Sequence, residues 1–311
     1  MNKRVLLLYF NSEQKAELMC CEGIFKALFR KFRTSVSFEY LLLDTSPTCR
    51  KQMSKLLCEK ISRNDSCLLC TDKELSYKES DFLYDITGHH STMYQSMGIS
   101  VFFPFERKQC HTQEDYVNET VSSKTEEIKR CITLCTDYAL TKKKTVFVCT
   151  DKNGIDEILF DEFQRVASNH RYLDARHMSR SEIIWHSAKY ISQPCVIFAN
   201  KSIADIVLMH TLAPQGLPSG YTLFHTERGK IYTNLYTPFS FENCLSTRLT
   251  VLAFAALIED ELGMKNAAFW LRQSISSVFS KFICKTRAEL AEKTILAINE
   301  PMRKKTYDYK Q

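Results

Sequence analysis

The sequence predicts an α/β fold in two lobes, with a mixed or largely parallel sheet flanked by helices. Short apolar runs of strand length alternate along the chain with longer segments whose apolar residues recur at helical spacing. The 311 residues are enough to bury a substantial core and to divide into two lobes. The 44% apolar and 25% charged residues are typical of an ordinary globular protein.

Strands and helices are expected to alternate through the first two thirds of the chain. Each expected strand is a short apolar run, and each expected helix repeats apolar positions every three or four residues. The expected strands are residues 4–9, 36–43, 66–70, 99–105, 145–150, 172–177 and 194–198. The expected helices are residues 16–32, 46–61, 123–139, 156–167 and 180–190. Residues 108–122 are polar and carry no clear element.

Two expected helices have a start that the sequence marks. Ser123 and Glu126, and later Thr286 and Glu289, stand three residues apart ahead of apolar residues at helical spacing. This is the capping-box pattern, in which the hydroxyl accepts from one free backbone amide and the carboxylate accepts from another. We therefore expect helices to begin at these two positions.

The segment 245–262 is apolar in every direction around a helix, so it predicts a buried helix rather than a surface one. Gly263 follows at once and is suited to end that helix.

Charge and hydropathy exclude several classes of protein. The 42 Lys and Arg residues exceed the 36 Asp and Glu residues by six, and this excess is scattered along the chain. We therefore expect no nucleic-acid partner. The apolar start at residues 5–10 has no small-residue cleavage site after it, so it is interpreted as a first strand and not as a signal peptide. No apolar stretch is long enough to span a membrane, and a cytoplasmic location is expected.

Thirteen cysteines are expected to be free thiols in such a reducing compartment. Cys67 and Cys70 have C-x-x-C spacing, but they lie in an apolar run that predicts a buried strand. No second Cys or His pair stands at zinc-finger spacing, which argues against zinc. A redox pair is the alternative interpretation. Cys131 and Cys135 lie one helical turn apart among apolar residues and are expected in the core.

Two residues are candidates for chemistry. Lys152 follows an expected strand and precedes an expected helix, and a lysine there can reach a ligand at the carboxyl end of a sheet. Asp205 opens the apolar stretch 203–209, where a carboxylate either caps a helix or binds a cation.

The order of motifs around these residues resembles the β-decarboxylating dehydrogenase family, which includes isopropylmalate, isocitrate and tartrate dehydrogenases. His177-Met178 leads without a gap to Ile203-Ala204-Asp205-Ile206, as in the family pattern H-M-x-x-D, strand, N-x-x-G-D-I-x-S-D. Further segments with family-like positions are 150–154, 159–163, 216–219 and 261–264. The resemblance spans nearly the whole chain, although each motif is weak alone.

The resemblance implies an isopropylmalate-dehydrogenase-like fold of two lobes. The larger, cofactor-side lobe would comprise residues 1–103 and 211–311, and a smaller lobe with a dimer face would comprise residues 104–210. In this family Mg²⁺ or Mn²⁺ and NAD or NADP act on a 2-hydroxy acid. Lys152 would correspond to the lysine that assists proton transfer, and Asp205 to one metal-binding carboxylate.

Departures from the family pattern outweigh these matches. Ser181 and Met209 stand where two further metal carboxylates belong. Met93 and Phe103 stand where two substrate arginines belong, and Arg107 is nearby but displaced. Residues 11–17 replace the glycine-rich start, and residues 234–241 replace the longer cofactor loop. No cofactor is therefore expected, and NAD(P) with Mg²⁺ or Mn²⁺ is expected only if the chain is active.

Three functions follow from this comparison of motifs. The leading hypothesis is a catalytically inactive homologue that serves as a binding, regulatory or structural subunit. It would form a homodimer, or a hetero-oligomer with a related chain, through apolar faces at residues 123–139 and 205–209. The second is an active dehydrogenase with a changed substrate and a histidine-based metal site. The third is a sensor of small anions or nucleotides that uses Lys152, Arg180 and Lys201.

Overall fold

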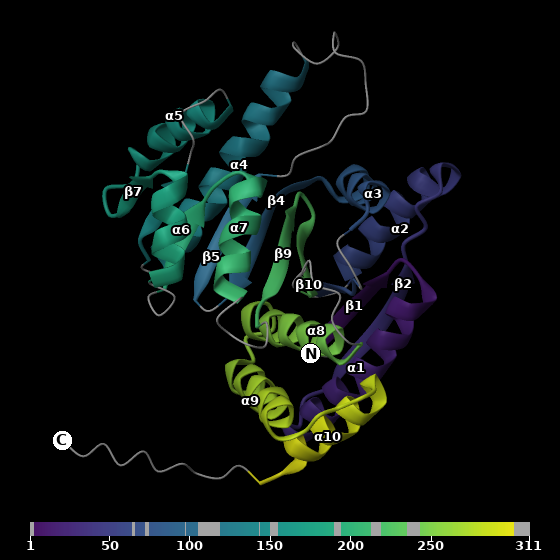
Figure 1. Ribbon diagram of the computed structural model, residues 1–311. Coiled ribbons are helices and arrows are strands. Elements are labelled where there is room, and N and C mark those ends of the chain that lie inside the picture. The colour runs from purple at the N-terminus through teal and green to yellow at the C-terminus, as the bar shows by residue number, and fades with distance from the viewer. Residues whose placement is uncertain are drawn as a thin grey trace, which may run out of the picture.

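The structure is a computed structural model that describes residues 3–63, 66–71, 75–96, 98–104, 119–142, 144–149, 155–189, 194–212, 219–234 and 243–301. Ten strands of this described part form one sheet with helices packed around it (Figure 1). The predicted α/β class with a mixed sheet is therefore confirmed.

The sheet joins two parallel groups through an antiparallel centre. The order is β2-β1-β3-β10-β9-β4-β5-β8-β6-β7. Strands β1, β2, β3 and β10 are parallel, as are β5, β8, β6 and β7, while β9 and β4 pair antiparallel with their neighbours. The strands are β1 (Lys3–Tyr9), β2 (Val36–Leu42), β3 (Ser66–Leu69), β4 (His89–Ser96), β5 (Ile99–Pro104), β6 (Val146–Cys149), β7 (Ala175–Met178), β8 (Cys195–Phe198), β9 (Tyr221–Thr226) and β10 (Gly229–Asn234).

Helical crossovers connect the parallel strands, as parallel pairing requires. The helices are α1 (Ser12–Lys31), α2 (Arg50–Arg63), α3 (Tyr77–Thr87), α4 (Glu119–Lys142), α5 (Ile155–Ala167), α6 (Arg180–Lys189), α7 (Lys201–Leu212), α8 (Asn243–Asp260), α9 (Lys265–Lys281) and α10 (Arg287–Asn299). A short 3₁₀ helix, η1 (Pro47–Cys49), precedes α2.

The expected elements before residue 200 are present, with shifted ends. The strand expected at 172–177 is β7, three residues later, and Tyr172 is 93% exposed. Helix α4 begins at Glu119, so the helix start expected at Ser123 is wrong, and Ser123 lies inside the helix. Because residues 108–122 are polar and carry no clear pattern, the sequence did not predict the additional helical turn before Ser123.

The second predicted cap is present in a modified form. Thr286 accepts from the Glu289 amide at 3.1 Å, as expected of an N-cap. Glu289, however, accepts from the amide of Lys285 at 2.9 Å and not from that of Thr286. The two side chains still satisfy two free amides at the start of α10.

Helix α8 is the buried helix that the sequence predicts. Its residues from Val251 to Ile258 are at most 6% exposed. The aromatic ring of Phe254 stacks on that of Phe25 in α1, with 3.6 Å between ring centroids. Gly263 adopts the left-handed conformation at φ 67°, and the Met264 amide then donates to the Ile258 carbonyl at 2.8 Å. The predicted end of the helix at this glycine is confirmed.

One hydrophobic cluster extends through both predicted lobes. It includes Leu7 of β1, Ile132 of α4, Ile197 of β8 and Leu290 of α10. The boundaries at residues 103–104 and 210–211 stay a prediction, since the sheet itself is continuous across them.

The described cysteines are free thiols, and Cys67 and Cys70 are both buried at the end of β3. Cys131 and Cys135 of α4 are fully buried, as predicted.

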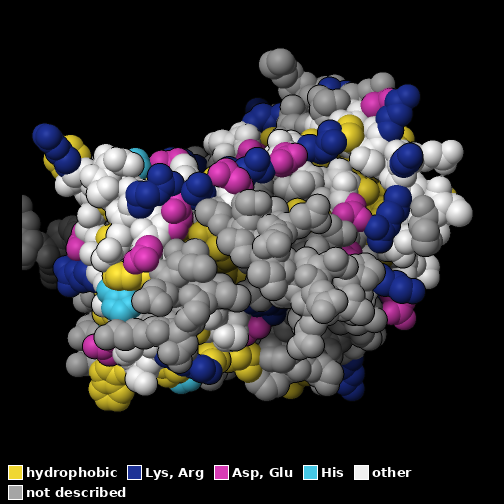
Figure 2. All heavy atoms as spheres, turned by 90° about the horizontal axis from the view of Figure 1, so that it is seen from above, with side chains coloured by type: hydrophobic (Ala, Val, Ile, Leu, Met, Phe, Trp, Pro, Cys, Tyr) yellow, Lys and Arg dark blue, Asp and Glu magenta, His cyan; other side chains and the backbone are white. Residues whose placement is uncertain are grey.

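On the face seen in Figure 2, Lys and Arg side chains alternate with Asp and Glu among the described residues. Within the described residues, no helix has the length and apolar character needed to span a membrane.

Candidate functional site

Asp205 lies one turn inside α7 and does not cap it. Asn200, between β8 and α7, accepts from the amide of Ile203 at 2.9 Å and so caps the helix. Of the two roles expected for Asp205, the structure therefore contradicts the helix cap. The Asp205 side chain instead contacts the sheet at Tyr94 of β4.

Both oxygens of the Asp205 carboxylate are engaged by neighbouring side chains. The Tyr94 hydroxyl donates to Oδ1 at 3.1 Å, and the Lys201 ammonium lies 2.7 Å from Oδ2. The lysine and aspartate side chains are 35% and 40% exposed, so solvent screens their attraction. Asp205 is therefore half of an ion pair at the surface of α7.

Two of the three positions at which the family resemblance predicts metal ligands lack a carboxylate. Ser181 is exposed in the first turn of α6, and Met209 is half-buried in α7. Mg²⁺ and Mn²⁺ bind through several oxygen ligands, and a thioether is a poor substitute. Among the described residues, no three His, Cys, Asp or Glu side chains come together as a metal site.

Three of the described histidines pack against different neighbours. The His89 ring lies within 3.0 Å of the Thr92 hydroxyl, His177 packs on Phe160, and His186 packs on Phe147. The histidine-based metal site of the second hypothesis gains no support from this arrangement.

Met93 and Phe103 cannot represent two arginines of one substrate clamp. Strand β4 pairs with β5 so that Met93 faces Phe102 and Thr92 faces Phe103. Directly paired residues share one face of a sheet, and successive residues alternate. Met93 and Phe103 therefore lie on opposite faces, and both are at most 3% exposed.

Three further candidates are cationic residues. Lys152 and Arg107 lie outside the described residues. Arg180 is exposed at the start of α6, where the Ser179 hydroxyl accepts from the Glu182 amide. Helices α6 and α7 follow β7 and β8, which run parallel, so Arg180 and Lys201 lie at the same edge of the sheet.

Two polar residues of the lobe predicted to bind the cofactor form local contacts in the described part of the chain. Asn11 accepts from the Gln14 amide at 2.9 Å, so a capped helix replaces the glycine-rich turn. At the end of β10, Asn234 accepts from the amide and hydroxyl of Thr71 and donates to its carbonyl. Residues 235–241 lie outside the described residues.

Glu17 of α1 forms a buried polar network that the sequence did not indicate. Its carboxylate is 1% exposed and accepts from the hydroxyls of Ser246 and Thr250 at 2.8 Å each. The Arg287 guanidinium lies 3.7 Å away. Burial raises the pKa of Glu17, and the two hydroxyls and Arg287 offset part of that effect.

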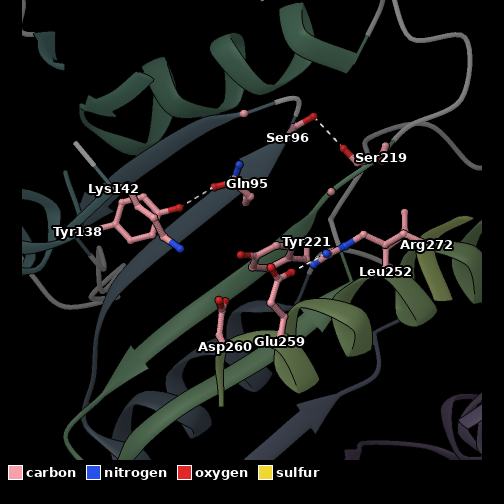
Figure 3. Close-up of a pocket in the computed structure, with 12 residues that line it drawn as sticks. Gln95, Ser96, Tyr138, Lys142, Ser219, Tyr221, Leu252, Glu259, Asp260 and Arg272 are labelled. Carbon is pink, nitrogen blue, oxygen red and sulfur yellow. Dashed lines mark hydrogen bonds and ion pairs between the residues drawn. The ribbon is translucent and has the colours of Figure 1, made fainter. Parts of the chain in front are cut away.

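A cavity of about 380 Å³ opens between α4, α8 and α9 and the ends of β4 and β9 (Figure 3). Its lining combines four charged side chains with two phenols, one amide, two serines, two glycines and one leucine. The residues are Gln95, Ser96, Gly98, Tyr138, Lys142, Ser219, Gly220, Tyr221, Leu252, Glu259, Asp260 and Arg272. Because these residues come from separate segments without a shared motif, no sequence pattern predicts this cavity.

Comparisons with known proteins show a fold and no closer relationship. No protein-family model matches the sequence, and no curated protein matches it. Among solved structures, the chain is similar to the isocitrate dehydrogenase from Methylococcus capsulatus, with a TM-score of 0.69 and 11% sequence identity. The match covers 96% of this chain and 100% of that one. This chain has an isocitrate-dehydrogenase-like fold. The predicted fold is confirmed, and at this identity the likeness shows the fold alone.

Proposed function

We propose that this chain is a non-catalytic relative of the NAD(P)-dependent 2-hydroxy-acid oxidative decarboxylases and acts as a binding or regulatory subunit. The fold supports the relationship, since the similar solved structure is an isocitrate dehydrogenase. The polar groups that such a reaction needs are replaced at Ser181 and Met209.

The contacts of Asp205 carry this proposal. A divalent cation at this carboxylate would have to displace the Lys201 ammonium from Oδ2 and would then be repelled by its positive charge. It would also compete with the Tyr94 hydroxyl for Oδ1. No second carboxylate of α7 compensates, because Met209 stands one turn further along the helix.

Calorimetric titration of Mn²⁺ into the full chain tests the proposal. We expect no saturable binding to the unchanged protein or to the Asp205→Asn variant. We also expect no reduced cofactor when 2-hydroxy acids are supplied with NAD, NADP and Mn²⁺. Tight Mn²⁺ binding that Asp205→Asn abolishes would contradict the proposal. Turnover that Lys152→Ala abolishes would show an active dehydrogenase with a changed substrate.

We further propose that the subunit associates with a second copy or a related chain, but not through the apolar faces expected from the sequence. Ile128, Cys131, Ile132 and Cys135 of α4 are at most 7% exposed within the single chain. The buried residues of α7 likewise belong to the chain's own core. Light scattering after size exclusion measures association, and a strict monomer at micromolar concentration would count against it.

A further inference from the structure

The cavity lies on the opposite face of the sheet from Asp205. Successive residues of a strand point to opposite faces. Tyr94 of β4 reaches Asp205 on α7, whereas the neighbouring Gln95 accepts from the Tyr138 hydroxyl on α4 at 3.3 Å. Tyr221 pairs with Gln95 across β9 and β4 and so shares its face. A ligand in the cavity would therefore occupy a place distinct from the dehydrogenase-like cleft.

Two of the four charged groups in the cavity neutralise each other. The Arg272 guanidinium of α9 forms an ion pair with the Glu259 carboxylate of α8 (Figure 3). This pair forms one side of the cavity and leaves Lys142 and Asp260 as the remaining opposite charges.

Lys142 and Asp260 stand on separate helices and, within the described part of the chain, neither forms an ion pair. The Tyr232 hydroxyl lies 3.4 Å from Asp260 but 3.0 Å from Glu261, and its single proton favours the nearer carboxylate. Asp260 thus keeps open acceptor positions.

Asp260 is an exposed carboxylate in a partly desolvating environment. Desolvation by the surrounding protein raises its pKa, and the positive charges of Lys142 and Lys230 offset part of that effect. The negative charge of Asp260 in turn helps to raise the pKa values of Tyr138 and Tyr221, for which desolvation is the larger cause. Both phenols are neutral at physiological pH. The Tyr221 hydroxyl can therefore donate to a ligand, whereas the Tyr138 hydroxyl already donates to Gln95.

We propose that this cavity binds a free amino acid as a zwitterion, with its ammonium group on Asp260 and its carboxylate on Lys142. Gln95, Tyr138 and Tyr221 supply neutral hydrogen-bonding groups, and Leu252 supplies an apolar contact for a side chain. A volume of about 380 Å³ lies at the small end of the range of roughly 300–1,000 Å³ for ligand pockets. A molecule of this size suits the cavity. Each of its charges would meet an opposite charge, on Asp260 or Lys142, that forms no ion pair with another described residue.

The test is a thermal-shift screen of the full chain against the twenty protein amino acids, followed by calorimetry with each one that stabilises it. A ligand that binds the folded state raises the melting temperature with concentration. We expect at least one amino acid to do so, whereas its decarboxylated and deaminated analogues bind at least about tenfold more weakly, because each lacks one charge-assisted hydrogen bond.

Asp260→Asn and Lys142→Met should each weaken binding by at least about tenfold. The matched controls Asp161→Asn on α5 and Lys55→Met on α2 change the same charges at exposed positions and should bind normally. Circular dichroism establishes that each variant is folded. The proposal is overturned if no amino acid binds, if the decarboxylated amine binds equally well, or if the two cavity variants bind like their controls.

Discussion

Glu17 shows how much a single buried carboxylate depends on its neighbours. It joins α1 to α8 through Ser246 and Thr250 and to α10 through Arg287. Hydrogen bonds and one guanidinium offset the cost of removing its charge from water, but the net effect still raises its pKa above the ordinary value of 4.5. The folded state therefore binds a proton at Glu17 more readily than the unfolded chain does.

The consequence is a defined pH dependence of stability. A carboxyl group whose pKa is raised by folding contributes stability that is full below its unfolded pKa and is lost as pH rises through its folded pKa. The free energy of unfolding of the unchanged protein, minus that of Glu17→Gln, should therefore increase as pH falls from neutral toward 4.5. Urea unfolding at a series of pH values measures this difference.

Glu13→Gln, an exposed change on the same helix, serves as the control and should show no such trend. A difference for Glu17→Gln that stays constant with pH, or that shrinks on acidification, would show that burial does not govern this carboxyl group.

Individual site residues were the hardest feature to predict. By the family resemblance, Ser181 and Met209 stand where carboxylates are expected, and the structure adds that Asp205 is paired with Lys201. The sequence could not show that Met93 and Phe103 face opposite sides of the sheet, because that depends on the register between β4 and β5. Nor could the sequence show that Lys142, Asp260 and Arg272 line one cavity, which depends on how three helices pack.

At the scale of single elements, the two predicted helix starts show how far a local sequence pattern predicts structure. Thr286 and Ser123 carry the same capping pattern, yet only Thr286 begins a helix. The pattern is a local preference, and residues before it can extend the helix when the fold provides a surface for an additional turn. The contribution of each of the two hydroxyl groups to the free energy of unfolding can be measured.

Thr286→Ala should lower the free energy of unfolding by about 1 kcal/mol, since it removes the acceptor of the Glu289 amide. Ser123→Ala should cause no capping loss, because the backbone there is already helical. Urea unfolding of both variants gives the comparison. Equal destabilisation by the two substitutions would contradict the helix start at Glu119.

Strands β4, β9 and β10 illustrate why some elements escape prediction. Strand β4 contains Ser91, Thr92 and Ser96, which are all buried polar residues. Their hydroxyl groups can be buried because neighbouring elements satisfy them, as when the Ser96 hydroxyl donates to the Ser219 carbonyl at 2.8 Å. An apolar alternation, the usual signal of a strand, is therefore missing from the sequence.

At the scale of the whole molecule, one sheet and one large cluster of apolar residues link the two predicted lobes. The central antiparallel strands connect parallel groups that run in opposite directions. We therefore expect the lobes to lose structure together, despite their separate positions in the sequence.

The two tryptophans make this expectation measurable. Trp270 lies half-buried on α9 in the larger predicted lobe, and its indole donates to the Ile298 carbonyl at 3.1 Å. Trp185 on α6 is 67% exposed, so Trp185→Phe is expected to leave stability unchanged while Trp270 alone reports by fluorescence. In that variant, fluorescence and far-ultraviolet circular dichroism should give one urea midpoint. A second dichroism transition after the fluorescence change is complete would show lobes that unfold separately.

The free thiols give this molecule a further experimental property. Cys67 on β3, Cys131 on α4 and Cys195 on β8 are buried, and burial raises the pKa of the first two to about 12 and of the third to about 11. A thiol reagent reacts with the thiolate, so each of these cysteines is protected until its own part of the fold opens. Mass spectrometry of timed alkylation would therefore rank the opening of β3, α4 and β8 in the native protein without any engineered label.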